Sequence, residues 1–349
     1  MKHGVATLGE ILNQPAVWKR CLQVLDQIDL EPLIGDKHPR KCRWVFVGCG
    51  TSYYLAQAAA ATLTSLTGFP ARALPASEML LFPALAHPPE EGEIFPVLIS
   101  RSGHTTEVVK LAESLNRRGI DFLAVTCDGN ELAQISKQLL TMPVKESSTV
   151  MTSSFTAMLM GLQYVAAKVT CQEAFIAALR RLPAALERLF EVYAHQVEQF
   201  AQQTFDDVAI LAQGALYPIA QEASLKVMES SSTYAQFFHT LEFRHGPKSI
   251  VSERVMVGAL ISESSYTQEC AVLLEMAQLG ARTLAVANRF TPEARGAFDL
   301  AIELSLDAPE AARLIVYVVW GQLLGSYMGL RKGLDPDSPR HLSRVVTIG

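Results

Sequence analysis

The stretch PVLISRSGHTTE, residues 96–107, decides the fold class of this chain. Its apolar run ends at Ile99 and is followed by a polar loop that carries hydroxyl groups, an arginine and a glycine. From residue 106 onward, TEVVKLAESLNRRG has apolar residues at helical spacing. A buried strand that leads through a short polar loop into a helix is the building unit of an α/β fold.

Strand-like and helix-like segments alternate along the rest of the chain. Strands are predicted at 44–50, 71–76, 95–100, 122–127, 140–144, 208–214, 255–262, 283–288 and 301–306. Matching strands lie roughly 160 residues apart, which indicates a duplicated unit. Continuous apolar strands that alternate with helices are typical of parallel sheets covered on both faces. The sequence therefore predicts an α/β protein with two parallel sheets, each flanked by helices in a flavodoxin-like three-layer αβα arrangement.

A long helical stretch at 175–203 separates the two sets of strands, and we place the domain boundary there. The tail is rich in proline and then briefly strand-like. The predicted organisation is an N-terminal helical arm (1–40), a first domain (41–172), a helical linker (173–204), a second domain (205–335) and a C-terminal tail (336–349).

Composition excludes several classes of protein. A net charge of −5 without a basic run argues against a general nucleic-acid binder. No window reaches about 18 uninterrupted apolar residues, and the start has no apolar signal core, so no membrane span or leader is expected. The cysteines lack zinc or paired spacing and the histidines lack metal motifs, so we expect free thiols, a cytoplasmic location and no metal or other cofactor.

The polar loop of the opening stretch is predicted to bind a phosphate group. A helix N-terminus offers unpaired N–H groups and a partial positive charge, which favour an anion. Ser100, Ser102 and Thr105 can add hydroxyl donors, beside Arg101. The alternative is plain helix capping by Ser102 or Thr105, which would explain one or two of these hydroxyls.

Two further loops support the phosphate interpretation. GCGTSY, residues 48–53, follows the first strand and offers Gly50 for close backbone approach and Thr51 and Ser52 as hydroxyl donors. It lacks the third glycine of a dinucleotide-binding fingerprint. A second hydroxyl-rich loop at 147–154, which contains Thr152, is expected in a comparable place.

Charged residues form a stripe on the helix predicted after the first strand of the second domain. Glu222, Lys226 and Glu229 stand at i, i+4 and i+7 and therefore share one face. A solvated face with one weak ion pair is the simple alternative. Because the segment is otherwise apolar or small, we expect the stripe to border a packed interface.

His245 lies in FRHGP, next to a Gly-Pro turn and near this helix in sequence, where it is either structural or a general acid–base. Together with the carboxylates it suits aldose–ketose chemistry. A carboxylate moves a proton between C1 and C2, a histidine opens the sugar ring, and a cation steadies the developing negative charge.

On these motifs the sequence resembles the sugar isomerase (SIS) domain family, over nearly the whole chain and as two tandem SIS domains. The matching segments are GCGTS, SRSGHTTE, MTSSFT, QEASLK, EFRHGP and DPDSPRHLSRVVTI, in the family's order. The chain is similar to the isomerase half of glucosamine-6-phosphate synthase. It looks closer to the galactosamine-6-phosphate deaminase/isomerase group, formerly called tagatose-6-phosphate ketose/aldose isomerases, through LGEILNQPAVW, TVMTSSFT and LEFRHGPKSIV.

The resemblance implies a role for each matched residue. Thr51, Ser52, Ser100, Ser102 and Thr105 match the residues that hold the sugar phosphate and nearby hydroxyls. Arg101 stands where the synthase has glutamine, which allows an added charge contact. Glu229 matches the proton-shuttling carboxylate, and Glu222 and Lys226 match its supporting residues. His245 matches the ring-opening histidine, which the neighbouring subunit supplies in the synthase, so a homodimer with shared active sites is implied.

Two departures weaken the carry-over of the synthase mechanism. Arg344 stands where the synthase has a catalytic lysine, and arginine stays protonated and cannot form a Schiff base. Ser153 replaces another lysine. The sequence also begins without the N-terminal cysteine and glutaminase domain of the synthase, so we do not expect it to take ammonia from glutamine.

We therefore expect a deaminase/isomerase that converts a hexosamine 6-phosphate, glucosamine or galactosamine 6-phosphate, to a ketose 6-phosphate and ammonia. Catalysis is assigned to Glu229, His245, Lys226 and Arg344. Two alternatives stay open: a ketose/aldose isomerase or fructosamine-phosphate deglycase, and a non-catalytic sugar-phosphate sensor. The sequence does not reveal the sugar epimer.

Overall fold

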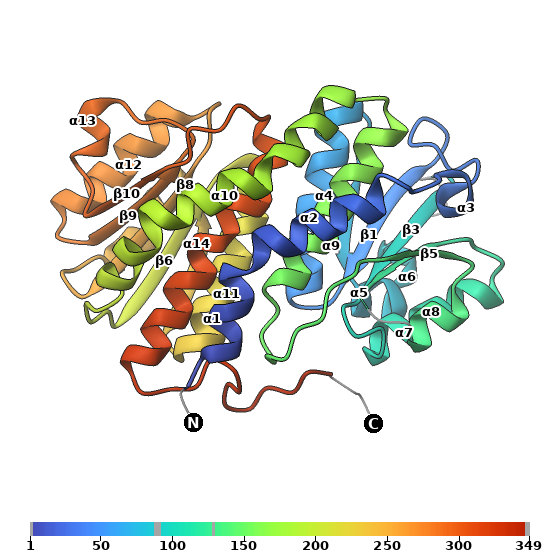
Figure 1. Cartoon of the computed structure of the whole chain (residues 1–349), viewed down its shortest axis with the longest axis horizontal. Coiled ribbons are helices and arrows are strands. Elements are labelled where there is room, and N and C mark those ends of the chain that lie inside the picture. The colour runs from blue at the N-terminus through green and yellow to red at the C-terminus, as the bar shows by residue number, and fades with distance from the viewer. Residues whose placement is uncertain (1–2, 87–91, 128–129, 346–349) are drawn as a thin grey trace. The chain divides into compact units, whose positions relative to one another are not determined.

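The computed structural model describes residues 3–86, 92–127 and 130–345. The described residues form two compact units, each built on one five-stranded sheet (Figure 1). We call them the first unit, within 13–146, 153–183 and 342–349, and the second unit, within 1–12, 147–152 and 184–341. They divide inside the long helix α10 (Glu173–Phe200), next to Pro183.

The first unit is a parallel sheet with helices packed on it. Its elements are α2 (Gln14–Leu25), α3 (Glu31–Ile34), β1 (Arg43–Gly48), α4 (Thr51–Thr67), β2 (Arg72–Pro75), α5 (Ala76–Leu81), α6 (Pro83–Ala86), β3 (Ile94–Ile99), α7 (Thr106–Arg117), β4 (Leu123–Thr126), α8 (Glu131–Ile135), β5 (Gln138–Thr141) and α9 (Ser153–Val169). The strand order is β2-β1-β3-β4-β5, and every described pairing is parallel. All residues of β3 are buried, as expected for a central strand covered on both faces.

The second unit repeats this topology. Its elements are α1 (Val5–Leu12), β6 (Asp207–Ala212), the 3-10 turn η2 (Gly214–Leu216), α11 (Tyr217–Ser231), β7 (Tyr234–His239), η3 (Glu242–Arg244), η4 (Pro247–Ile250), β8 (Val255–Ile261), α12 (Tyr266–Gln278), β9 (Arg282–Ala287), α13 (Pro292–Arg295), β10 (Leu300–Glu303) and α14 (Glu310–Arg331). The parallel strands run in the order β7-β6-β8-β9-β10, which is the order of the first sheet with its chain positions moved by roughly 160 residues. The predicted duplication and α/β class are confirmed.

The predicted strands are confirmed with small shifts at their ends, and one strand was missed. β5 ends at Thr141, short of the predicted 140–144, since Pro143 has no N–H to donate to a sheet. β7, YAQFFH, was not predicted because it is an edge strand with exposed ends, so it lacks the continuous apolar run of its neighbours. Residues 342–345 form no strand, and the rest of the strand-like tail lies outside the described residues.

The N-terminal arm is divided between the units. Its first helix, α1, packs on α14 in the second unit, where Thr7 donates through both N–H and hydroxyl to the Asp337 carboxylate at 2.7 Å. α2 belongs to the first unit, where the Trp18 indole N–H donates to Thr156 Oγ1 at 2.9 Å. The arm is therefore divided, with α1 in the second unit and both α2 and α3 in the first.

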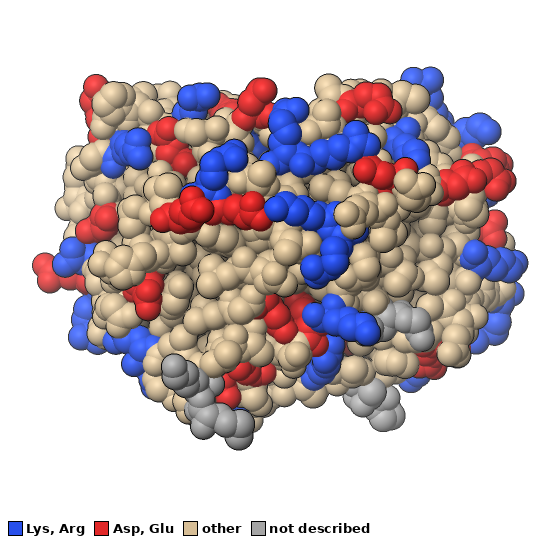
Figure 2. Space-filling view, viewed as in Figure 1, with Lys and Arg blue, Asp and Glu red and all other residues tan. Residues whose placement is uncertain are grey.

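Surface charge, helix hydrophobicity and the state of the cysteines can also be read from the structure. Acidic and basic side chains are mixed over the face drawn in Figure 2. None of the helices within the described residues combines the length and the apolar character needed to cross a bilayer. None of the six cysteines, all of which lie within the described residues, forms a disulfide bond.

Candidate functional site

The loop after β3 is held in one conformation by its own hydroxyl groups. Ser100 Oγ accepts the Gly103 N–H at 3.1 Å and lies 3.2 Å from Thr105 Oγ1. Gly103 has φ +64°, and a Cβ there would lie 1.7 Å from Asn130 Oδ1, so this position requires glycine. Thr105 is the N-cap residue of α7 but makes no side-chain capping bond. Simple capping therefore does not account for these hydroxyls.

A second polar loop follows β1, the neighbour of β3 in the sheet. Gly50 precedes α4 with φ +54°, and Thr51 and Ser52 lie buried in the first turn of that helix. The strand order reverses between β1 and β3, and ligands of open α/β sheets bind at such a switch point, outside the carboxyl ends of the strands. Both loops emerge at that edge.

Arg101 is tied to a carboxylate that the sequence analysis did not single out. Its Nη1 lies 3.1 Å from Glu146, and both side chains are buried. The same carboxylate accepts the Ser154 N–H at 2.9 Å and the Ser154 hydroxyl at 2.5 Å. Glu146 therefore offsets the charge of Arg101 inside the first unit.

The residues of the hydroxyl-rich loop at 147–154 fall in both units. Its residues 147–152 belong to the second unit, where Ser148 donates to the Glu10 carboxylate and the Thr152 carbonyl accepts from Gln322 Nε2 at 3.2 Å. The loop's hydroxyls at 148 and 154 already donate to carboxylates. That Thr152 takes part in binding the phosphate stays a prediction.

An open pocket of about 740 Å³ lies at the carboxyl edge of the first sheet. It is lined by Ser102, His104, Asn130, Glu131, Gln134, Arg344 and Val345. Arg344 reaches it from the C-terminal segment, and its carbonyl lies 3.5 Å from Arg101 Nη2. The structure thus brings together two candidate residues, Ser102 and Arg344, that lie far apart in the sequence.

The charged stripe of α11 is buried. Lys226 Nζ lies 2.5 Å from Glu229 Oε2 and 3.3 Å from Glu222 Oε1. The side chains of Glu222 and Lys226 are 0% and 1% exposed, whereas that of Glu229 is 17% exposed. The stripe is therefore not a solvated helix face. Its partly exposed member is the carboxylate to which the sequence analysis assigned proton transfer.

Lys226 carries its proton in this setting. Burial works against its charge, but the carboxylates of Glu222 and Glu229 outweigh that effect and raise the pKa of Lys226 above its ordinary value. A protonated lysine is a charge partner and hydrogen-bond donor for Glu229. It is not a nucleophile for a carbonyl group.

Close packing of α14 holds this helix in place (Figure 1). A Cβ at Gly325 would lie 2.6 Å from the Lys226 carbonyl oxygen, and one at Gly321 would lie 2.4 Å from the Ala223 Cβ. The spacing of four residues places these glycines on one face of α14, so the two backbones approach closely along that face. The position of the carboxylates thus depends on residues of α14 that carry no functional group.

His245 lies on the surface of the second unit. It ends the turn η3 and precedes Gly246, which has φ +127°. The residue is exposed. The structure thus leaves the imidazole accessible at a sharp turn.

Part of this chain matches a known protein family, and nearly all of it resembles solved structures. Residues 39–168 match the family model described as SIS domain, over the whole of the first sheet. A solved glucosamine-6-phosphate deaminase from Thermotoga maritima is 26% identical with a TM-score of 0.79, covering 98% of this chain and 100% of that one.

Two other similarities extend beyond residues 39–168. The tagatose-6-phosphate ketose/aldose isomerase of Escherichia coli shares the fold, with a TM-score of 0.84, 22% identity and coverage of 96% of this chain and 95% of that one. The isomerizing glutamine–fructose-6-phosphate aminotransferase of Methanothermobacter thermautotrophicus is 25% identical over 346 residues, 98% of this chain. This chain spans 57% of the length of that relative.

Sequence reasoning missed two residues of the first unit, Asn130 and Glu146, that position its loops. Asn130 packs against Gly103 and caps α8 through its side chain, which accepts the Ala133 N–H at 3.3 Å. Its place directly after the β4 strand is a signal that could have revealed it. No local pattern marks Glu146 as the partner of Arg101, because the two are brought together by the packing of the chain.

Proposed function

We propose that this protein is an amino-sugar-6-phosphate deaminase/isomerase that converts a hexosamine 6-phosphate to a ketose 6-phosphate and ammonia. The observation that carries the proposal is the buried cation between two carboxylates on α11, with one of them, Glu229, partly exposed. The likeness to the Thermotoga maritima glucosamine-6-phosphate deaminase, which extends over nearly all of both chains, supports the amino-sugar substrate.

The proposed chemistry is a proton transfer followed by hydrolysis. With the sugar in its open-chain aldehyde form, Glu229 removes the proton from C2, and the electron pair of that bond forms the C1–C2 double bond as the C1 carbonyl oxygen takes a proton from a water molecule and becomes a hydroxyl. Glu229 returns the proton to C1, and the nitrogen lone pair forms a ketimine at C2. Water adds to C2, ammonia leaves, and the ketose remains. Lys226 keeps its proton and balances the charge of Glu229 throughout.

The phosphate is proposed to bind at the carboxyl edge of the SIS domain. The hydroxyls of Thr51, Ser52, Ser100, Ser102 and Thr105 and the backbone at Gly50 are the proposed ligands. Arg101 contributes a cation whose position Glu146 determines. Arg344 lines a pocket together with Ser102 and would steady negative charge on the substrate without forming a covalent bond.

His245 is proposed to open the ring in the active site of a second copy of the chain, which makes the active form a homodimer. Its exposure at a sharp turn suits a residue that acts on another molecule. An imidazole can both accept and donate a proton, as ring opening requires.

Ammonia release tests the function directly. The full chain is offered glucosamine 6-phosphate and galactosamine 6-phosphate separately, and ammonia is followed by coupling to glutamate dehydrogenase. Release from either sugar supports the proposal and reveals the preferred C4 epimer. If neither sugar releases ammonia, the proposed deaminase activity is refuted. Turnover of a ketose or aldose 6-phosphate under the same conditions would then indicate an isomerase.

Two variants assign the roles. Glu229→Gln should lower kcat by at least about a hundredfold, the usual contribution of a general base, while phosphate binding persists. The matched control Glu191→Gln changes an exposed carboxylate of α10 and should have no effect. Ser102→Ala should raise KM more than it lowers kcat, whereas Ser114→Ala on the following helix should change neither. Retained turnover in Glu229→Gln would refute its role.

Mixing two inactive variants tests the homodimer. If His245 acts in the partner's site, refolding Glu229→Gln together with His245→Ala produces hybrid dimers with one intact site. About a quarter of the wild-type activity should return, from random pairing in a two-fold dimer. No recovery, with each variant folded, would place His245 and Glu229 in the same chain's site or remove His245 from the reaction.

A further inference from the structure

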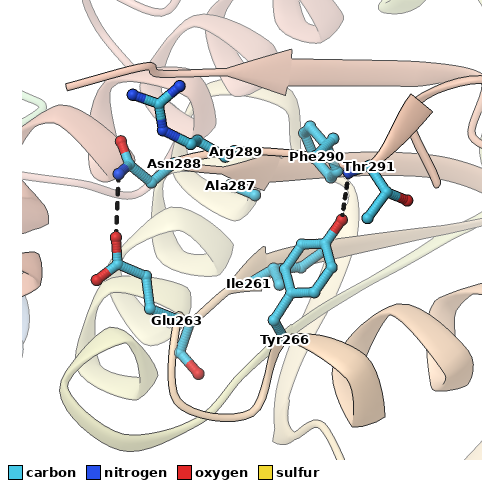
Figure 3. Close-up of a pocket in the computed structure, with 9 residues that line it drawn as sticks. Ile261, Glu263, Tyr266, Ala287, Asn288, Arg289, Phe290 and Thr291 are labelled. Carbon is cyan, nitrogen blue, oxygen red and sulfur yellow. Dashed lines mark hydrogen bonds between the residues drawn. The ribbon is translucent and has the colours of Figure 1, made fainter. Parts of the chain in front are cut away.

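The second unit contains a pocket at the same topological position as the pocket at Ser102 in the first. It is lined by the loops after β8 and β9, as Figure 3 shows, just as the Ser102 pocket is lined by the loops after β3 and β4. Its volume is about 360 Å³, within the range of small-molecule sites. The proposed function makes no use of it.

The loop sequences confirm that the two positions correspond. ISRSGHTTE, residues 99–107, follows β3, and ISESSYTQE, residues 261–269, follows β8. The two segments agree at the isoleucine, both serines that flank the third position, the threonine and the final glutamate. The loop after β8, which lines the second pocket, is therefore a divergent copy of the loop proposed to bind a sugar phosphate.

The copy differs in charge at the position that matters for phosphate. Glu263 stands where the first unit has Arg101. The Glu263 N–H donates to the Glu310 carboxylate at 2.8 Å, so a second carboxylate lies beside the loop. A phosphate in this place would meet two carboxylates at short range, and like charges repel. The copied loop therefore lacks the arginine that the first loop offers to a phosphate.

The groups that remain suit a neutral sugar ring. Glu263 Oε1 accepts from Asn288 Nδ2 at 3.0 Å and pairs with buried Arg313 at 2.7 Å, which neutralises the carboxylate and fixes its position. Its other oxygen, Oε2, has no hydrogen-bond partner among the described residues and can accept from a hydroxyl.

Two aromatic rings complete the pocket (Figure 3). The Tyr266 hydroxyl accepts the Thr291 N–H at 2.9 Å, which fixes that ring, and Phe290 lies beside it with ring centroids 6.5 Å apart. Aromatic walls with a few placed polar groups are typical of small-molecule sites, and the C–H face of a sugar ring packs against such walls. The Arg289 side chain is exposed at the rim, where it can donate to a hydroxyl.

We propose that this pocket binds a sugar ring that carries no phosphate group. A hydroxyl of the ring donates to Glu263 Oε2, Arg289 donates to another, and the C–H face of the ring packs on Tyr266 and Phe290. The second unit thereby carries a sugar site of its own, separate in sequence and in charge from the phosphate loop of the SIS domain.

Isothermal titration calorimetry on the full chain tests this site with D-galactose, D-glucose, N-acetyl-D-galactosamine and N-acetyl-D-glucosamine as probes. At least one probe should bind. Glu263→Gln should weaken that binding about tenfold or more, because it replaces a charged acceptor with a neutral one. Arg289→Ala, an exposed position where folding is not at risk, should weaken it severalfold. Glu293→Gln, an exposed carboxylate on the adjacent α13, is the matched control and should leave it unchanged.

The outcomes separate this site from the proposed active site. Ser102→Ala and Glu229→Gln should leave the binding of the neutral sugar intact. No binding by any probe at millimolar concentration would overturn the proposal. So would binding that both pocket variants leave unchanged, or that Ser102→Ala abolishes. A 6-phosphate form that depends on Glu263 and binds more tightly than its neutral sugar would show that the charge argument is wrong.

Discussion

Replacing Lys226 by methionine removes the cation that Glu222 and Glu229 share, with little change in side-chain volume. Glu229 is partly exposed and can regain some hydration, but Glu222 is fully buried and cannot. At an effective dielectric constant of about 20, unit charges 3.3 Å apart attract by about 5 kcal/mol. Removal of one member of a buried pair typically costs 3–5 kcal/mol, because the other charge stays buried without its partner. We therefore expect Lys226→Met to lower the free energy of unfolding by about 4 kcal/mol at neutral pH.

The loss of unfolding free energy caused by Lys226→Met should depend on pH. In the folded variant a buried Glu222 without a cation favours its protonated form, whereas in the unfolded chain it ionises near pH 4.3 as a free glutamate does. The folded state then binds more protons than the unfolded state, so stability rises as the pH falls. The loss caused by Lys226→Met should be smaller at pH 5 than at pH 7. Urea unfolding followed by circular dichroism at both pH values measures it.

A second variant separates charge from packing. Glu222→Gln combined with Lys226→Met removes both buried charges, so most of the lost stability should return and the additional pH dependence should disappear. A loss below about 1 kcal/mol in Lys226→Met, or no recovery in the double variant, would refute the argument that the buried ion pair governs the stability of α11.

Three further expectations follow from particular residues. Gly103→Ala combines an unfavourable positive φ with a clash against Asn130, so unfolding experiments should show a loss of about 2 kcal/mol and kinetics a raised KM for the phosphosugar. Gly325→Ala forces α14 away from the Lys226 carbonyl and should cost about 1–3 kcal/mol and lower kcat, whereas an effect below about 0.5 kcal/mol would mean that the helices separate freely. Burial raises the pKa of Glu269 more than its bonds to Ser262 and Ser265 lower it, so its contribution to stability is full below about pH 4.3 and is lost as the pH rises through the raised folded value. Glu269→Gln should remove that part of the decline in Tm between acidic and neutral pH, and an unchanged pH profile would contradict it.

Much of the fold was predictable because its signals are local. Apolar runs such as 95–100 identify strands that are buried on both faces, and the polar loop at 100–105 marks the carboxyl end of one of them. β7 escaped prediction because an edge strand with exposed ends has no such run. The duplication could have revealed it, since β7 lies roughly 160 residues after β2, its counterpart in the first sheet.

Some features of the candidate site were likewise predictable from the sequence, and others only from the structure. The spacing of Glu222, Lys226 and Glu229 follows from helical periodicity, but the sequence left open whether their face is solvated. The structure decides that it is buried, because glycines of α14 let that helix pack against α11. The link between Arg101 and Glu146 was likewise invisible, since buried charges find their partners through packing across the chain rather than through spacing along it.

By itself, the sequence determined the period of each element, the parallel and duplicated class of the fold and the chemistry present in each loop. The tertiary structure decided which charges are buried, which are paired, and that Ser102 and Arg344 line one pocket. The physical reason is that periodicity and loop chemistry are properties of neighbouring residues. Burial and charge pairing are set instead by which distant segments exclude water from one another.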